Sequence, residues 1–218
     1  MDLKILFILS LTLVTIAQCK LVRLSCKHIR TLVDGHNSRR LQIAKGSILN
    51  QPAAAEMKMM LWDEELAKKA EKWAIKDHNY HNPDKTLPSG RFLTGENLYW
   101  YSTTNHKYNL DLEKGLDSWF SEHVNFTFGP LTNAMFDQNK PHDIGHYTQM
   151  VWADSSYLGC AMTQSFKDEW NKFYVVCNYG PTGNYIREKP YRVSGGPSKK
   201  LICGTKDCSR PYGPKCKK

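Results

Sequence analysis

One histidine stands at the head of an apolar segment, where an imidazole could bind a metal ion or transfer a proton. His146 opens the run Tyr147–Trp152, and the next two residues are a tyrosine and a threonine. A zincin-type protease would carry a second metal-binding histidine close behind on the same helix, and this segment has none. Serine and cysteine residues are absent from any recognisable nucleophile motif. These residues favour a binding protein over a hydrolase.

The N-terminus has the pattern of a secretory signal peptide. Lys4 precedes an apolar run from Ile5 to Ala17, and the small residues Ala17 and Cys19 lie at positions −3 and −1 before Lys20. We expect cleavage after Cys19, with cleavage after Ala17 as the alternative. The run is too short to span a bilayer comfortably, and no other stretch approaches that length. The sequence therefore predicts a soluble, secreted, extracellular protein with no transmembrane segment.

The cysteine count agrees with secretion. Seven cysteines become six if Cys19 leaves with the signal peptide, and an even set in an oxidising compartment predicts three disulfides. Cys160 and Cys177 lie on the two arms of an expected β-hairpin and could face each other across it. The pairing of the remaining four stays open among three arrangements. These four are Cys26, Cys203, Cys208 and Cys216.

Apolar residues at helical spacing predict three helices that must position these groups. The first covers Thr31–Ala44, and the second follows Asp63, which is a suitable N-cap. The third runs from about Leu112 to Val124, with both of these residues facing inward. Residues 79–94 have the composition of a loop. Three strands are expected near residues 147–152, 158–164 and 172–178.

Positive charge is concentrated at the C-terminal end. Residues 187–218 hold ten Lys or Arg and two Asp or Glu, a balance of +8, whereas the whole chain is +9. Such a tail could attract anionic surfaces or an acidic receptor, or it could simply be solvated. Ser194–Ser198 has the composition of a linker. A secreted chain without a recognition motif predicts no nucleic-acid partner.

Four segments in order resemble signature motifs of the CAP superfamily, which comprises cysteine-rich secretory proteins, antigen 5 and pathogenesis-related-1. They are His36–Arg40, Gly95–Leu98, Gly145–Trp152 and Tyr174–Asn184. The resemblance implies an α+β fold, an α-β-α sandwich with a central antiparallel sheet, followed by a short disulfide-held tail. It divides the chain into a signal peptide (1–19), a CAP domain (20–186) and a basic cysteine-containing tail (187–218).

Within that superfamily the chain looks most similar to arthropod antigen 5 and to venom or salivary proteins. The pattern of Leu61–Ala67 followed by Ala70–Ala74 carries this likeness. Two cysteines usual in antigen 5 relatives, near Asp77 and Thr86, are absent, as expected if one whole disulfide has been lost. The tail is also shorter than the ion-channel-regulatory domain of cysteine-rich secretory proteins, so channel activity does not carry over from that domain.

The resemblance also implies a site of two histidines and two acids around a central cavity. Carried over to this sequence, they are His81, Glu96, Glu122 and His146. His78 is an alternative to His81, which is preferred for its spacing from Trp73. Imidazole and carboxylate are ordinary ligands of zinc-like divalent cations, so no cofactor is required but such a cation is a candidate. A mutually satisfied structural network and acid–base catalysis are the other two roles.

The expected function is that of a secreted, non-enzymatic, antigen 5-like venom or salivary protein that binds a host target or a small apolar mediator. An ion-channel-modulating toxin and a metal-dependent hydrolase or protease are the alternatives. The expected partner is a host receptor, a channel or a small lipid, and the expected state is a monomer. Asn125 begins an N-glycosylation sequon, and Tyr99–Tyr101 are expected either to pack in the core or to line an apolar groove.

Overall fold

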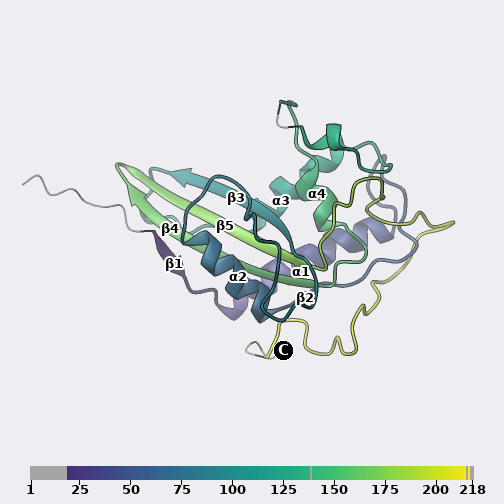
Figure 1. Cartoon of the computed structure of the whole chain (residues 1–218), viewed down its shortest axis with the longest axis horizontal. Helices are drawn as coiled ribbons and strands as arrows, with labels where there is room; N and C mark the ends of the chain where they lie inside the picture. The colour runs from purple at the N-terminus through teal and green to yellow at the C-terminus, as the bar shows by residue number, and fades with distance from the viewer. Residues whose placement is uncertain (1–18, 138, 215, 217–218) are drawn as a thin grey trace, which may run out of the picture.

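The structure is a computed structural model that describes residues 19–137, 139–214 and 216. The predicted signal peptide lies outside the described residues except for Cys19. One continuous antiparallel ladder forms the centre of the molecule (Figure 1). The strands are β1 (Lys20–Val22), β3 (Gly95–Thr103), β4 (Tyr157–Lys167) and β5 (Trp170–Gly180), in the spatial order β1-β4-β5-β3, and β2 (Leu61–Trp62) adds a parallel pairing to β4.

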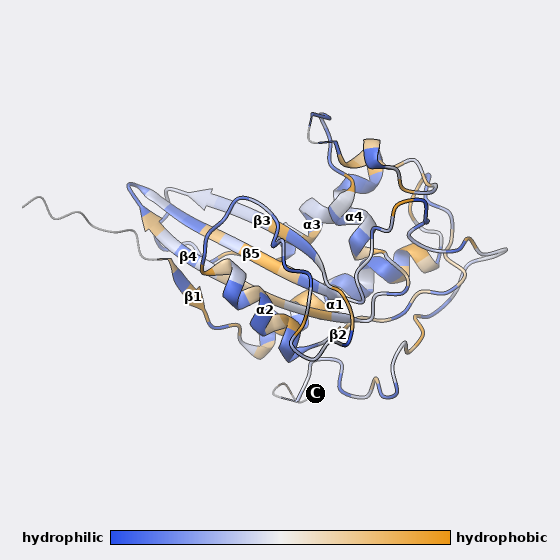
Figure 2. Cartoon of the chain, viewed as in Figure 1, coloured by the Kyte–Doolittle hydropathy of each residue, from blue (hydrophilic) through white to orange (hydrophobic). Residues whose placement is uncertain are grey.

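Helices cover both faces of this sheet, which confirms the predicted sandwich. One face packs against α2 (Glu64–Ala74), whose Trp73 meets Leu98 and Val176 in a buried cluster. The opposite face packs in the main core with α1 (Cys26–Ala44), α3 (Glu113–Ser121) and α4 (Gly145–Met150) (Figures 1 and 2). Two 3₁₀ turns, η1 (Glu122–Asn125) and η2 (Asn133–Phe136), are the other helical elements of the described residues.

Two helix starts show how local sequence sets the elements. The Asp63 carboxylate accepts hydrogen bonds from the backbone N–H groups of Glu65 and Leu66, as expected of an N-cap. The first helix starts earlier than predicted, at Cys26, because the Ser25 hydroxyl accepts from the N–H of His28 and His28 bonds back to Ser25. Helical spacing alone had shown only the apolar part of this helix.

The strand predicted at residues 147–152 is wrong, because Gly145–Met150 forms α4. A short apolar run does not separate a strand from a buried helix by its period. Here a residue distant in the sequence stabilises the helix, since the Glu122 carboxylate accepts hydrogen bonds from N–H groups of its first turn. Val124, predicted to face inward, lies in η1 beyond the end of α3 and is 74% exposed.

The side chain of Arg40 joins three separate parts of the chain. It is fully buried in α1 and donates five hydrogen bonds, all of them to backbone carbonyl oxygens. One acceptor is Lys58, and the other four lie between the last residue of α4 and the start of β4, namely Met150, Trp152, Ala153 and Ser155. Burial lowers the pKa of Arg40 to about 9. This guanidinium holds the segment between α4 and β4 in place.

The C-terminal tail is fastened along the body. Disulfides join Cys26 to Cys216, Cys160 to Cys177 and Cys203 to Cys208. The N–H of Trp62 donates to the Pro211 carbonyl, and the Tyr212 hydroxyl donates to Asp34.

Within the described residues, no helix has the length and apolarity needed to cross a membrane.

Replacing Arg40 with lysine should destabilise the fold by about 3–5 kcal/mol, because one ammonium cannot reach five buried carbonyls in a planar fork. Chemical denaturation monitored by circular dichroism measures this loss. Arg192→Lys is the matched control, since its ion pair with Glu56 is exposed and should contribute little. Equal effects of the two variants would contradict the role assigned to Arg40.

Candidate functional site

Two histidine–carboxylate pairs lie beside each other at the edge of the sheet. His81 Nδ1 is 3.0 Å from Glu96 Oε1, and His146 Nδ1 is 2.6 Å from Glu122 Oε1. The centroids of the two imidazole rings are 6.4 Å apart. The structure thus brings together the four residues that the resemblance had pointed to, and it does so as two pairs.

Glu122 fixes both the ring and the backbone of His146. While Oε1 bonds the imidazole, Oε2 accepts the N–H groups of His146 and Tyr147, each at 3.0 Å. A carboxylate at this place also complements the positive end of α4. Trp119 from α3 stacks against the other side of the imidazole, with ring planes 20° apart. The orientation of His146 is therefore set by its neighbours on η1 and α3.

The second pair is more open. Glu96 comes from β3 and is 8% exposed, whereas His81 comes from the loop that precedes this strand and is 57% exposed. Glu96 Oε1 also accepts the N–H of Asn82, and Glu96 Oε2 is buried without a hydrogen-bond partner in the described structure. His78 takes no part, because it stacks on Tyr80. The geometry places His81, and not His78, beside Glu96.

A buried hydrogen-bonded chain links the site to α1. His36 Nδ1 donates to the Leu32 carbonyl, and its Nε2 accepts from the Tyr179 hydroxyl at 2.8 Å. Tyr179 in turn accepts from the Asn97 amide, which also donates to the carbonyl of His146. Burial lowers the pKa of His36 to about 3. His36 is thus a neutral packing and hydrogen-bonding residue of α1.

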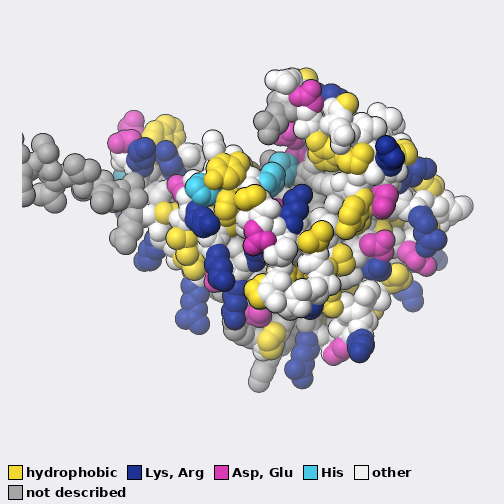
Figure 3. All heavy atoms as spheres, in the orientation of Figure 1, with side chains coloured by type: hydrophobic (Ala, Val, Ile, Leu, Met, Phe, Trp, Pro, Cys, Tyr) yellow, Lys and Arg dark blue, Asp and Glu magenta, His cyan; other side chains and the backbone are white. Residues whose placement is uncertain are grey.

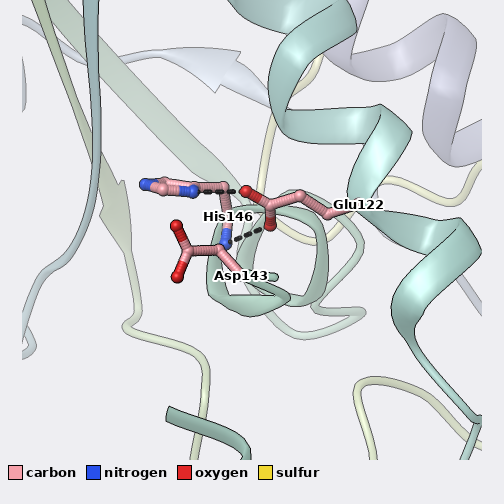
Figure 4. A group of neighbouring side chains, drawn as sticks. All are labelled: Glu122, Asp143 and His146. Carbon is pink, nitrogen blue, oxygen red and sulfur yellow. Dashed lines mark hydrogen bonds and ion pairs between the residues drawn. The ribbon is translucent and has the colours of Figure 1, made fainter. Parts of the chain in front are cut away.

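Asp143 is a site neighbour that sequence reasoning missed. Ligand atoms of Asp143, Glu122 and His146 all lie within 4.8 Å of one another. Figure 4 shows the Asp143 carboxylate beside the imidazole, while Glu122 bonds the ring nitrogen and the backbone N–H of His146. The only signal in the sequence is its place three residues before His146, which becomes informative once the turn into α4 is known.

The aromatic side chains of Tyr99 and Trp100 point to opposite sides of β3. Tyr99 packs against Trp119 towards the core, whereas Trp100 stacks on Tyr174 from the opposite side of the strand and is 46% exposed. Hydrophobic side chains and histidines gather on this face of the molecule (Figure 3). A cavity of about 610 Å³ lies away from the histidine–carboxylate pairs, between Trp152–Asp154 and Glu188–Val193. None of the four paired residues lines it.

The match to known proteins now identifies the family. Residues 33–179 match the sequence pattern of CAP, the cysteine-rich secretory protein family. The chain belongs to the CAP family. Venom allergen 5 of Rhynchium brunneum is 38% identical to it over 75% of this chain and 72% of that protein. Venom allergen 5.02 of Dolichovespula maculata is 34% identical over 73% and 74%. Both relatives agree with a venom-type CAP protein.

Solved CAP structures share the architecture. The crystal structure of NaASP2 with Zn²⁺ superposes with a TM-score of 0.61 at 28% identity, over 84% of this chain and 92% of that one. BmVAL-1 gives a TM-score of 0.62 at 25% identity, over 86% and 93%. The sandwich described above is therefore the CAP fold.

The donor set of the site suits a divalent cation. Each carboxylate holds the Nδ1 atom of one histidine, and in the described structure neither Nε2 atom makes a hydrogen bond. A carboxylate that accepts from one ring nitrogen fixes the tautomer and leaves the other nitrogen free to bind metal. The buried, unpartnered Oε2 of Glu96 adds a polar atom in need of a partner.

Acid should destabilise the protein through His36. Because the folded-state pKa of about 3 lies below the ordinary 6.5, the stabilisation is complete above pH 6.5 and is lost as the pH falls towards 3. The slope contributed by this one residue is up to about 1.4 kcal/mol per pH unit. Urea denaturation at several pH values measures it. His36→Gln should flatten the slope, and exposed His142→Gln should not; an unchanged slope in His36→Gln would refute the assignment.

Proposed function

We propose that this chain is a secreted, non-enzymatic venom allergen 5-type protein that acts by binding, with a divalent cation held at His81 and His146. The observation that carries the cation proposal is the pair of imidazoles whose Nδ1 atoms are bound by carboxylates and whose rings lie 6.4 Å apart. Neutral imidazoles held in this way are good zinc ligands. The bound ion would join the loop that carries His81 to α4.

A solved relative supports the same choice of ion. The NaASP2 structure was determined with Zn²⁺ and shares this fold at 28% identity. In the present chain, Glu96 and Glu122 each hold one imidazole and also accept backbone N–H groups, Glu96 from the loop that carries His81 and Glu122 from α4. They therefore serve as partners that orient the ligands. Zinc would supply a positive charge between these two elements.

The contacts around the histidines argue against hydrolysis. In the described chain, the hydrogen bonds of both rings go to carboxylates, and neither ring bonds a hydroxyl or thiol group. A nucleophile activated by histidine needs such a bond. Cys160 and Cys177, the cysteines of the central hairpin, are joined in a disulfide and offer no thiol. A binding role fits these contacts better than turnover does.

Secretion and the binding partner complete the proposal. Three disulfides among the described residues fit an oxidising compartment, as does the signal-like pattern of residues 1–19. The partner would be a host protein, met by the surface and the basic tail, or a small apolar molecule. The cavity beside Trp152 and Tyr191 has a volume of about 610 Å³, which is typical of small-molecule sites.

Zinc binding tests the site directly. Isothermal titration of metal-free protein with ZnCl₂ should give one bound ion per chain. His81→Ala and His146→Ala should each weaken binding by more than about tenfold, because each removes a ligand. His142→Ala is the control, since that histidine is exposed and lies next to the site without pairing. Absence of zinc binding in the parent, or equal affinity in all variants, would rule out the cation site.

The mass of the secreted protein tests the processing. Expression in insect cells should yield a chain that begins at Lys20, the first residue of β1, and that is lighter by the six hydrogens of three disulfides. Asn125 is exposed at the end of η1, so the sequon should carry a glycan that Asn125→Gln removes. Intact mass spectrometry reads all three features. A chain that begins at Gln18 would instead retain Cys19 and show that cleavage follows Ala17.

A further inference from the structure

We infer that Asp143 is an additional metal ligand, which adds a carboxylate to the two imidazoles of the site. This inference rests on the proposed cation site and deepens it. Its basis is the cluster in which Asp143, Glu122 and His146 each bring a donor atom within 4.8 Å of the others. In this cluster Glu122 and His146 are hydrogen-bonded to each other, whereas the Asp143 carboxylate has no such bond in the described structure.

Glu122 is the residue of the cluster whose carboxylate is already fully engaged in hydrogen bonds. Its two oxygens accept hydrogen bonds from the ring of His146, the N–H of His146 and the N–H of Tyr147. Detaching it to bind metal would release the imidazole and uncap α4 at once. Glu122 is therefore better suited to orient the ligand than to serve as one.

Asp143 is the available member. It is exposed, and in the described part of the chain it forms no hydrogen bond or ion pair. Its carboxylate lies next to the imidazole of His146 (Figure 4). A carboxylate placed beside a metal-binding imidazole is a common oxygen ligand of zinc and manganese.

The backbone next to Asp143 is held firmly for an exposed segment. Asn184 donates to the carbonyl of Gly145 at 2.9 Å and accepts from the hydroxyl of Thr148 at 2.8 Å. The N–H of Thr148 donates to the carbonyl of Ile144. These bonds fix the backbone directly after Asp143, which keeps the residue close to His146. Preorganisation of this kind lowers the cost of ordering a ligand on binding.

The set of two imidazoles and one carboxylate has a consequence for metal preference. Oxygen ligands favour harder cations such as Mn²⁺, whereas imidazole alone favours zinc and its neighbours. Loss of the Asp143 carboxylate should therefore weaken Zn²⁺ binding and weaken Mn²⁺ binding by a larger factor.

The test is a titration of metal-free, full-length mature protein with ZnCl₂ and, separately, with MnCl₂ at fixed pH and ionic strength. Asp143→Asn should lower the Zn²⁺ affinity by about tenfold or more, and Asp143→Glu should recover part of the loss. Asp137→Asn is the matched control. It removes the same charge from the same exposed segment and keeps the side-chain oxygen that accepts from Asn139.

The outcomes separate this inference from the proposed function. If His146→Ala loses zinc but Asp143→Asn binds as the parent does, Asp143 is not a ligand and the cation site stands. If Asp143→Asn and Asp137→Asn lose affinity equally, the effect is one of long-range charge, and the inference is again overturned. If the parent binds neither metal, the cation site itself fails. A loss confined to Asp143→Asn establishes the ligand.

Discussion

The buried guanidinium of Arg40 is the interaction on which the arrangement of the site depends. It binds carbonyls of the segment that leaves α4, while Glu122 binds the N–H groups at the start of the same helix. A six-residue helix has little stability of its own, because nucleation costs more than so few bonds return. Here both ends are completed by side chains from elsewhere, so His146 is held on a short helix that would not persist in isolation.

Polar contacts, and not apolar packing alone, connect the layers. The chain from His36 through Tyr179 and Asn97 to the carbonyl of His146 runs from α1 across β5 and β3 to α4. Each member is buried, and each bond requires the next group to be in place. Such a network is costly if incomplete, so it favours one relative position of helix and sheet over near alternatives. The open half of the site, at His81, lies outside this network, and the His81 side chain is 57% exposed.

The parts of the structure that sequence could predict are those set by near neighbours. The period of apolar residues gave α2 and most of α1 and α3, and Asp63 marked the start of α2 correctly. The start of α4 could not be predicted, because the group that caps it lies 24 residues away in Glu122. Motif resemblance supplied the four paired residues, since it carries information about distant contacts. Asp143 lies outside those motifs, and its proximity to His146 depends on a turn with no apolar period.

The disulfide between Cys26 and Cys216 closes residues 26–216 into a covalent ring, since the two cysteines are 190 positions apart. A ring of this kind changes what a single cut by a protease does. A nick in an exposed stretch such as residues 83–86 opens the ring into a linear molecule but releases no fragment, because the bridge still joins the two parts. Digestion in an oxidising fluid would therefore leave a nicked but undivided protein after one cleavage.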